Sequence, residues 1–314
     1  MMAIMSFSSA PDARTLGRVA GALAVDEAFV EKDWFVVQAI ARLVASGTDD
    51  ITPIFSGGTS LLKGHALIKR FSEDIDFKLG LSPAFVALSG NQRRKALGVF
   101  KDDLEAGWAD AGFTDMKVEA RDANGFLKIE MAYPTILGGH DALRPHVLAE
   151  LSAKPPRLQT IARPLSSYVN QYRGLEPEVS AIPCIDPVET AADKLSAFAW
   201  RMIVRDRSAA DDDPTIVRHL HDLAALESTA TASTVFPALL AETLVADTHR
   251  GGGAVAHLDP PDRLGVMLAK LAADTAYDGE YSRFVEGMAF AGESEVPTYG
   301  EAIRALSRLA ALLV

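Results

Sequence analysis

The sequence predicts an α+β protein in which a mixed sheet with helices occupies the first half and helices fill the second. Three observations lead to this fold class. Apolar and polar residues alternate from Phe71 to Leu79, as on a strand with one buried face. Strand-like stretches recur between residues 113 and 153, and from Pro187 onward apolar residues recur at helical spacing. The length of 314 residues fits two domains, which we place at 1–165 and 166–314.

Turn and capping residues set the limits of the expected elements. An apolar strand stops at Ser56-Gly57-Gly58, and Asp186 before Pro187 marks a helix start, since Asp caps helices and proline suits their first turn. The expected helices are 15–46 with a break near Val25–Asp26, 59–68 with Ser56 or Thr59 as N-cap, 91–111, 187–207, 215–227 and most of 235–314. The expected strands are 51–55, 71–79, 116–120, 126–133 and 146–153.

Composition and charge exclude several classes of protein. With 48% hydrophobic and 23% charged residues, the chain is neither disordered nor a coiled coil, and no apolar run is long enough to span a membrane. A net charge of −11 argues against a sequence-blind DNA binder. The acidity lies in residues 208–314, which hold 7 basic and 16 acidic residues, whereas residues 1–207 hold 24 and 26. The single cysteine, Cys184, fits a reducing cytoplasm, where we expect the protein to act.

The residues that carry chemistry are concentrated between Phe55 and Phe77. Gly57 and Gly58 at a strand end allow a phosphate to approach the backbone closely, and the helix that follows directs its N-terminal amides there. Asp74 and Asp76 then alternate on one strand face, where two carboxylates can bind Mg²⁺, or Mn²⁺, through oxygen ligands. Nucleotidyl transfer requires such a phosphate cradle beside a metal site, because the metal orients the triphosphate and neutralises the leaving pyrophosphate.

Each part of this pattern is weak by itself. A D-x-D pair is more often a solvated acidic strand, and a Gly-Gly turn has many uses. The order of strand, Gly-Gly, helix and D-x-D strand favours the functional interpretation of Asp74 and Asp76.

The stretch F-S-G-G-T-S-L, followed by R-F-S-E-D-I-D-F, resembles the signature of the DNA-polymerase-β-like nucleotidyltransferase superfamily. It resembles more closely the AbiEii/AbiGii family, the nucleotidyltransferase toxins of type IV toxin–antitoxin pairs. Weaker segments resemble the same family in the same order: Val30–Trp34, Ala192–Arg201 with its K-x6-R spacing, and Arg218–Leu223. The resemblance covers nearly the whole chain. The acidic segment Arg207–Asp213 departs from the family pattern, which leaves the position of the last segment open.

The resemblance implies a polymerase-β-like core followed by a helical domain that closes the nucleotide cleft. It implies transfer of a nucleoside monophosphate from an NTP to an acceptor hydroxyl, with the tRNA 3′ end as the expected acceptor and growth arrest as the consequence. A cognate antitoxin would be encoded separately and need not bind the toxin directly. The expected nucleotide-binding residues are Gly57, Gly58, Thr59, Ser60, Ser72 and Arg201, and Lys194 would bind the triphosphate.

Three cations form one stripe of the expected helix 187–207. Lys194, Arg201 and Arg205 lie 7 and 4 residues apart, a spacing that suits a triphosphate or an RNA backbone. The alternative is ion pairing on a solvated surface, with Glu189, Asp193 or Asp206 as partners. The resemblance, which assigns Lys194 to the nucleotide, favours the functional interpretation.

Further acids complete the expected catalytic set. Asp222 matches a family acid of the active site, and the alternative is an ion pair with Arg218 one turn earlier. A third carboxylate is expected beside the D-x-D pair, and Glu130 and Glu150 are both polar residues in apolar strands. The family pattern favours Glu150, and the other would pair with a lysine such as Lys128. Glu150 or Asp222 would then activate the acceptor hydroxyl.

Other charged residues near these motifs are expected to be structural. We expect Lys63 and Lys69 to be solvated helix charges, and Glu31, Lys32 and Asp33 to anchor the N-terminal helix to the core.

Two other classes of function stay open. One is nucleotidylation of a protein or small-molecule acceptor by the same core. The other is a non-catalytic nucleotide-binding module, against which the presence of Asp74, Asp76 and Lys194 argues.

Overall fold

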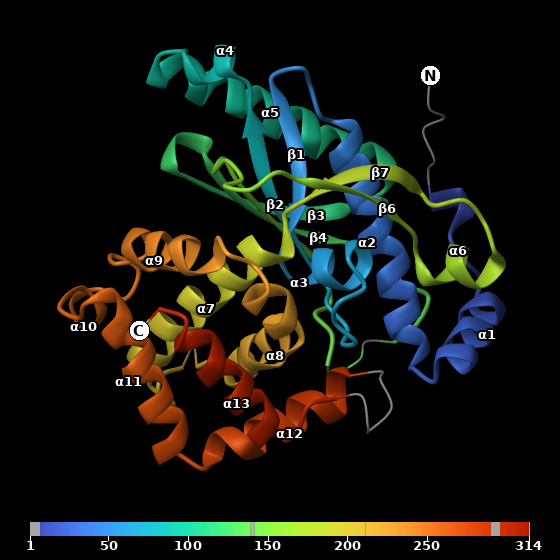
Figure 1. Cartoon of the computed structure of the whole chain (residues 1–314). Coiled ribbons are helices and arrows are strands. Elements are labelled where there is room, and N and C mark those ends of the chain that lie inside the picture. Colours follow the sequence, from blue (N-terminus) through green and yellow to red (C-terminus); the bar gives the residue numbers. More distant parts are fainter. Residues whose placement is uncertain (1–6, 139, 141, 211, 290–295, 314) are drawn as a thin grey trace. The chain divides into compact units, whose positions relative to one another are not determined.

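The computed structural model describes residues 7–138, 140, 142–210, 212–289 and 296–313. Their contacts divide the chain into two units, Met1–Ala66 with Phe71–Ile185 and Leu67–Arg70 with Asp186–Val314. The first unit contains the sheet and the second contains helices, so the predicted α+β class is confirmed (Figure 1). The division follows Ile185 rather than residue 165, because residues 179–184 form a strand of the sheet.

In the part of the chain that the structure describes, seven strands form one mixed sheet with the order β3-β4-β5-β2-β1-β7-β6. The strands are β1 (Ile51–Ser56), β2 (Asp74–Leu81), β3 (Thr114–Arg121), β4 (Phe126–Ala132), β5 (Val147–Ser152), β6 (Ile161–Leu165) and β7 (Val179–Cys184). Strand β2 pairs with β1 antiparallel and with β5 parallel, and β1 pairs with β7 in parallel. Strands β6 and β7 were not among the predicted strands, and β2 begins at Asp74, three residues later than predicted.

The helices of the sheet unit begin and end at the residues that the sequence marks. Asp26 caps the second helix by accepting from the Ala28 amide, and the first large helix after β2 starts with a Ser89–Gln92 capping box and ends at Gly112 in a left-handed conformation. The helical segments of this unit are η1 (Phe7–Ser9), α1 (Ala13–Leu23), α2 (Glu27–Ala45), α3 (Gly57–Thr59), η2 (Ser60–Gly64), α4 (Pro83–Val86), α5 (Gly90–Ala111), η3 (Asp122–Asn124) and α6 (Tyr168–Arg173).

The two faces of β2 have different environments. Ile75, Phe77 and Leu79 are buried and pack in one core with apolar residues of α2 and α5. The indole nitrogen of Trp108 in α5 donates to the carbonyl of Ala39 in α2 at 3.0 Å, which joins these two helices. The opposite face of β2 carries polar side chains that are only partly buried. The sheet therefore presents its polar face away from this core.

The helix after the two glycines is shorter than expected. It was predicted to reach residue 68, but α3 and η2 end at Gly64, and Ala66 has a positive φ of 53° that a continuing helix does not allow. The next residues, Leu67–Arg70, group with the helical unit. Segment η2 is a π-helical turn, a form that is frequent at functional sites.

The second unit is helical in its described residues. Asp186 caps its first helix by accepting from the Val188 amide, as predicted, and the helix ends at Val204 because Arg205 leaves the helical conformation. The segments are α7 (Pro187–Val204), η4 (Pro214–Val217), α8 (Arg218–Thr231), α9 (Phe236–Ala246), α10 (Gly253–Ala256), α11 (Pro260–Ala273), α12 (Ala276–Met288) and α13 (Tyr299–Ala310). None of the described helices has the length and apolar character needed to cross a membrane.

Candidate active site

The strand register brings three carboxylates to the polar face of the sheet. Asp74 and Asp76 alternate on β2, and Asp76 lies directly opposite Glu150 of β5. Neighbouring strands are about 4.8 Å apart, so these side chains lie next to each other. Glu130 is opposite Leu148, one strand farther from Asp74, and its carboxylate lies 3.4 Å from the amine of Lys128. The geometry therefore favours Glu150 over Glu130 as the third acid.

Gly57 lies against the carboxylate of Asp76. Its φ is +72°, and a Cβ placed on it would lie 1.9 Å from Oδ2 of Asp76. Only glycine fits here, since a side chain would be strained and would also displace the carboxylate. The two parts of the sequence motif, Gly-Gly and D-x-D, thus meet in one place.

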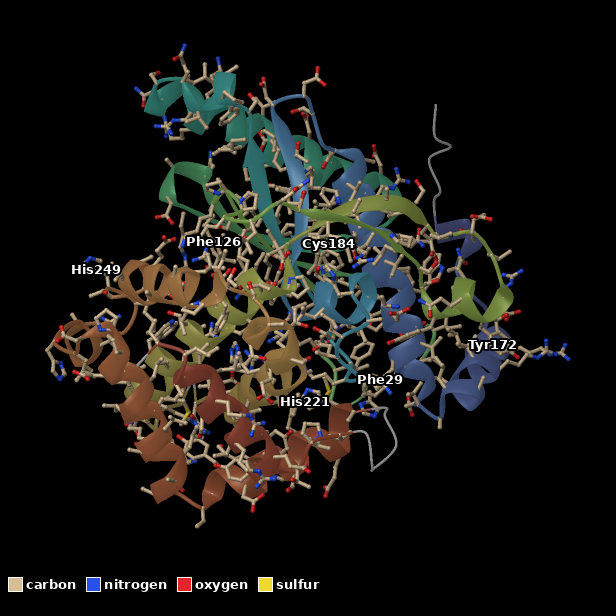
Figure 2. The ribbon with its side chains drawn as sticks, in the orientation of Figure 1. Phe29, Phe126, Tyr172, Cys184, His221 and His249 are labelled. Carbon is tan, nitrogen blue, oxygen red and sulfur yellow. The ribbon has the colours of Figure 1, made fainter. Side chains whose placement is uncertain are left out.

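Thr59 and Ser72 connect the glycine turn to β2. The Thr59 hydroxyl donates to the carbonyl of Asp74, and Oγ of Ser72 lies 3.0 Å from Oγ1 of Thr59. Ser60 is buried, its hydroxyl faces the thiol of Cys184, and its backbone amide donates to the carbonyl of Gly57. The Thr59 contacts hold the glycine turn against β2, and the nucleotide-binding roles predicted for Thr59 and Ser60 stay predictions. The sheet unit carries Cys184, which is labelled in Figure 2, at the end of β7.

Arg144 contacts a residue of the candidate site, and no sequence motif indicated this contact. It lies in the loop before β5, and its guanidinium forms an ion pair with the carboxylate of Asp74. Its backbone amide donates to both carboxylate oxygens of Glu73 at 3.2 Å. The two residues of the Arg144–Asp74 pair are 70 positions apart in the chain, so no local pattern could have revealed the contact.

The Glu31-Lys32-Asp33 segment of α2 holds the loops around the carboxylates. Lys32 is fully buried, and its amine lies 2.5 Å from the Glu73 carboxylate. Asp33 forms a buried ion pair with Lys63, whose side chain is 2% exposed and whose amine lies 3.7 Å from the centre of the Tyr168 ring. The expectation that Lys63 is solvated was therefore wrong. Burial lowers the pKa of Lys63 and raises that of Asp33, and each charge opposes the shift of the other.

A separate cluster in the helical unit surrounds Asp222. This carboxylate is fully buried and accepts from Arg70 in a bidentate pair, Nε to Oδ1 and Nη2 to Oδ2, both at 2.7 Å. The amine of Lys194 lies 2.7 Å from Oδ2. Burial alone would raise the pKa of Asp222, but Arg70 and Lys194 outweigh it and hold the pKa well below its usual range. The Asp222 carboxylate is thus held between two cations, and the predicted roles of Asp222 and Glu150 in activating the acceptor stay predictions.

The other two cations of the predicted stripe also have partners. Nη1 of Arg201 lies 2.7 Å from Nε2 of His219. Arg205 donates to Asp212 and to Glu280, with the shortest contact to each at 2.7 and 2.6 Å. The stripe is therefore not an open row of cations, and Arg205 has a structural role. Within the acidic segment 207–213, Asp211 lies outside the described residues.

The carboxylates fit a metal that is shared with a substrate. Among the residues that the structure describes, no three His, Cys, Asp or Glu side chains are grouped closely enough to surround an ion. Mg²⁺ is usually bound by one or two carboxylates together with substrate phosphates, which matches Asp74 and Asp76. The missing side chain of Gly57 leaves room for the Asp76 carboxylate itself, because a Cβ on Gly57 would overlap that carboxylate.

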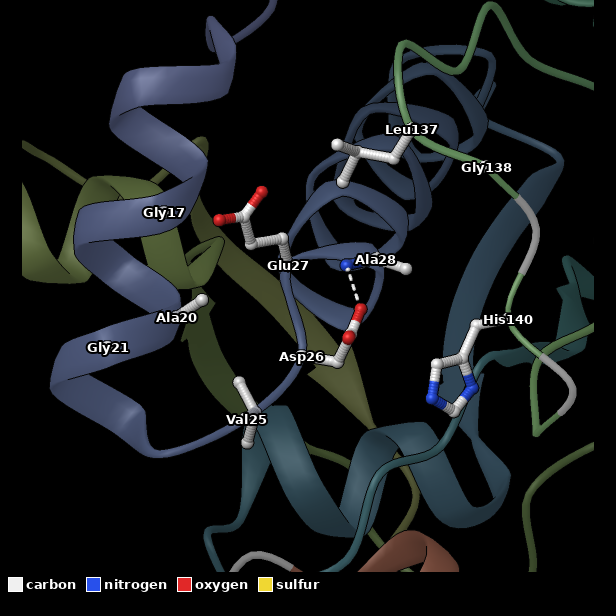
Figure 3. A pocket seen from close by; sticks show the side chains of 10 residues that line it. All are labelled: Gly17, Ala20, Gly21, Val25, Asp26, Glu27, Ala28, Leu137, Gly138 and His140. Atoms are coloured by element: carbon white, nitrogen blue, oxygen red, sulfur yellow. Dashed lines mark hydrogen bonds between the residues drawn. The ribbon is translucent and has the colours of Figure 1, made fainter.

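An open depression of about 610 Å³ lies elsewhere on the sheet unit (Figure 3). Small residues of α1, the start of α2 and the loop near Leu137 line it. The Asp26 carboxylate at its edge caps the Ala28 amide at 2.8 Å, and the His140 ring packs edge-on against Phe29 at 4.9 Å. None of the predicted site residues lines this depression.

A Gly-Gly turn packed against one of two aspartates on a single strand of an α+β fold is the arrangement predicted for a nucleotidyltransferase. The sequence model of the family described as "Nucleotidyl transferase AbiEii toxin, Type IV TA system" matches residues 38–305. The chain belongs to this family. Among solved structures it is similar to MenT4, a nucleotidyltransferase toxin from Mycobacterium tuberculosis H37Rv, with a TM-score of 0.51 and 16% sequence identity over 95% of this chain and 98% of that chain. This likeness concerns the fold. No curated protein sequence matches significantly.

Proposed function

We propose that this protein transfers a nucleoside monophosphate from an NTP to the 3′ end of tRNA and that Mg²⁺ supports the reaction. The observation that carries the proposal is the contact between Gly57 and the carboxylate of Asp76, with Asp74 and Glu150 on the same sheet face. The contact places the Gly-Gly turn directly beside two carboxylates that can bind a metal, and nucleotidyl transfer requires such carboxylates next to the phosphate-binding turn.

In the proposed reaction, a 3′ hydroxyl oxygen of the acceptor bonds to the α-phosphorus of the NTP. The bond from this phosphorus to the bridging oxygen breaks, and pyrophosphate leaves. Asp74 and Asp76 would hold Mg²⁺, which neutralises charge on the triphosphate when bound. Glu150 would accept the hydroxyl proton, since it lies beside Asp76 on the same face.

Lys194 is proposed to bind the triphosphate. Its amine is held by the Asp222 carboxylate, and Arg70 on the same carboxylate keeps Asp222 in place. In this arrangement Asp222 is a positioning residue for Lys194.

An acceptor end of tRNA requires a modest basic surface rather than a basic protein. Residues 1–207 have 24 basic and 26 acidic residues, so their near-neutral charge is compatible with such a surface. An antitoxin encoded by a separate gene would complete the pair, without a requirement for direct binding.

The test is a labelling assay with purified protein, Mg²⁺, total bacterial tRNA and each of four α-labelled NTPs in turn. We expect label in tRNA with at least one NTP and none with the Asp74→Asn/Asp76→Asn variant. Chelation of the metal with EDTA should abolish the label, and excess Mg²⁺ or Mn²⁺ should restore it. Label in protein or in a small molecule, with none in tRNA, would contradict tRNA as the acceptor. It would still support a nucleotidyltransferase reaction.

A further inference from the structure

Arg144 is placed to compete with a metal for Asp74. Its guanidinium pairs with the carboxylate that the proposed function assigns to Mg²⁺. A divalent cation and a guanidinium on one carboxylate repel each other. Arginine remains charged at every physiological pH, so it cannot relieve this repulsion by losing a proton. The side chain must therefore move, or gain a new anionic partner, when a metal binds.

The backbone of Arg144 is fixed, so the movement is confined to its side chain. The amine of the fully buried Lys32 donates to the carbonyls of Arg144 and His146 at 2.5 and 2.8 Å. The same amine pairs with Glu73, which in turn accepts from the Arg144 amide. The Arg144 side chain is 43% exposed, which leaves it room to change rotamer. A fixed base and a mobile cationic end suit a residue that exchanges one anion for another.

We propose that Arg144 is a substrate-binding residue that releases Asp74 and binds a phosphate oxygen of the NTP when a divalent cation occupies Asp74. The inference rests on the proposed function, which places the triphosphate on the same carboxylates. Asp74 would hold a metal that also binds phosphate oxygens of the substrate. The Arg144 guanidinium already lies at the Asp74 carboxylate, and its planar set of donors matches phosphate geometry. Lys32 is the positioning residue that holds the Arg144 loop for this exchange.

Two binding measurements without turnover test the proposal. The variants are Arg144→Ala and Arg144→Lys, with Arg121→Ala as the control because Arg121 is an exposed arginine paired with Glu119 at 2.6 Å. Mn²⁺ binding is measured by electron paramagnetic resonance in the absence of nucleotide. Affinity for each NTP with Mg²⁺ is measured by calorimetry, and thermal unfolding checks that every variant is folded.

The expected results have opposite signs. Arg144→Ala should bind Mn²⁺ about 2- to 5-fold more tightly than the wild type, since a partly exposed competing charge is removed. It should bind the NTP about 10- to 100-fold more weakly, because a hydrogen bond to a charged group is lost. Arg144→Lys should lie between the wild type and Arg144→Ala in NTP affinity, and Arg121→Ala should match the wild type in both.

A folded Arg144→Ala protein with unchanged Mn²⁺ and NTP affinities would overturn the inference, and so would a variant that weakens both together. If Arg144→Ala does not fold, the same two measurements on Arg144→Lys decide the question, since a purely structural pair would leave its NTP affinity unchanged. A wild-type protein that binds Mn²⁺ and NTP but labels no acceptor would contradict the proposed function instead. The two failures are thus distinguishable.

Discussion

Arg70 and Asp222 form a bidentate ion pair that is almost completely excluded from water. Both N–O distances are 2.7 Å, and the two side chains are 5% and 0% exposed. Lys194 lies on the same carboxylate, and the Phe284 ring lies 5.6 Å below the Arg70 guanidinium. One buried carboxylate thus pairs with two cations at once, and its removal would take the Asp222 ion pair from both of them.

We therefore expect Asp222→Ala to destabilise the protein strongly. Breaking a buried ion pair costs about 3–5 kcal/mol, because the remaining charge stays buried. Glu227→Ala is the matched control, since it breaks the more exposed pair with Arg308 on α13 and should cost about 1 kcal/mol at most. Urea unfolding at pH 7, followed by circular dichroism, compares the two. Equal losses for both variants would show that Arg70 and Lys194 find other partners.

The contact between Gly57 and Asp76 predicts that Gly57→Ala inactivates the enzyme without unfolding it. The added Cβ would overlap the Asp76 carboxylate and would require a strained positive φ. A displacement of about 1 Å at a reacting group can reduce the rate about 100-fold, and we expect a loss of at least this size in nucleotide transfer. Gly107→Ala is the control, since a Cβ at that helical position meets nothing within 4 Å and should add about 0.4–1 kcal/mol of stability. Activity in Gly57→Ala equal to that of the control would contradict the site.

The sheet register predicts different outcomes for the two candidate acids. Glu150→Gln should reduce the rate of transfer by about 10²- to 10⁴-fold, the usual contribution of a general base. Glu130→Gln should change it little, because Glu130 lies beyond Leu148 and pairs with Lys128. Pyrophosphate release at saturating NTP measures both. A larger effect from Glu130 than from Glu150 would reverse the assignment.

Local signals in the sequence were sufficient for many of the elements. The cap at Asp186 predicted the start of α7, because capping depends on neighbouring residues alone, and the predicted break near Val25–Asp26 lies between α1 and α2. The alternation in β2 gave the face that carries Asp74 and Asp76 for the same reason. The fold class and the family followed from these elements and motifs.

What the sequence could not give depends on partners far along the chain. Lysines are rarely buried without a partner, so Lys63 was expected in solvent, but Asp33 supplies that partner from a different helix. Arg144 has no signal of its own, since only the fold brings it to Asp74. The same holds for Arg205, whose acidic partners lie after α7 and on α12 rather than on its own helix.

His219 gives a prediction about pH. Burial and then the nearby Lys194, Arg218 and Arg201 lower the pKa of His219 well below 6.5, with Asp222 opposing this shift. Because the Arg201 guanidinium can only donate, we assign Nε2 of His219 as the acceptor and place the proton on Nδ1. The folded protein therefore holds a neutral His219, whereas the unfolded chain takes up a proton near pH 6.5.

The unfolded state thus binds more protons than the folded state between pH 6.5 and the lowered pKa. The stabilisation from neutral His219 is complete above about pH 6.5 and is lost as the pH falls below it. One proton contributes a slope of up to about 1.4 kcal/mol per pH unit to the free energy of unfolding. We expect His219→Gln to remove this slope between pH 6.5 and 5, measured by urea unfolding, and His257→Gln, at an exposed position, to keep it. An unchanged slope in His219→Gln would mean that His219 is already protonated in the folded state, and the contact with Arg201 would then have to be different.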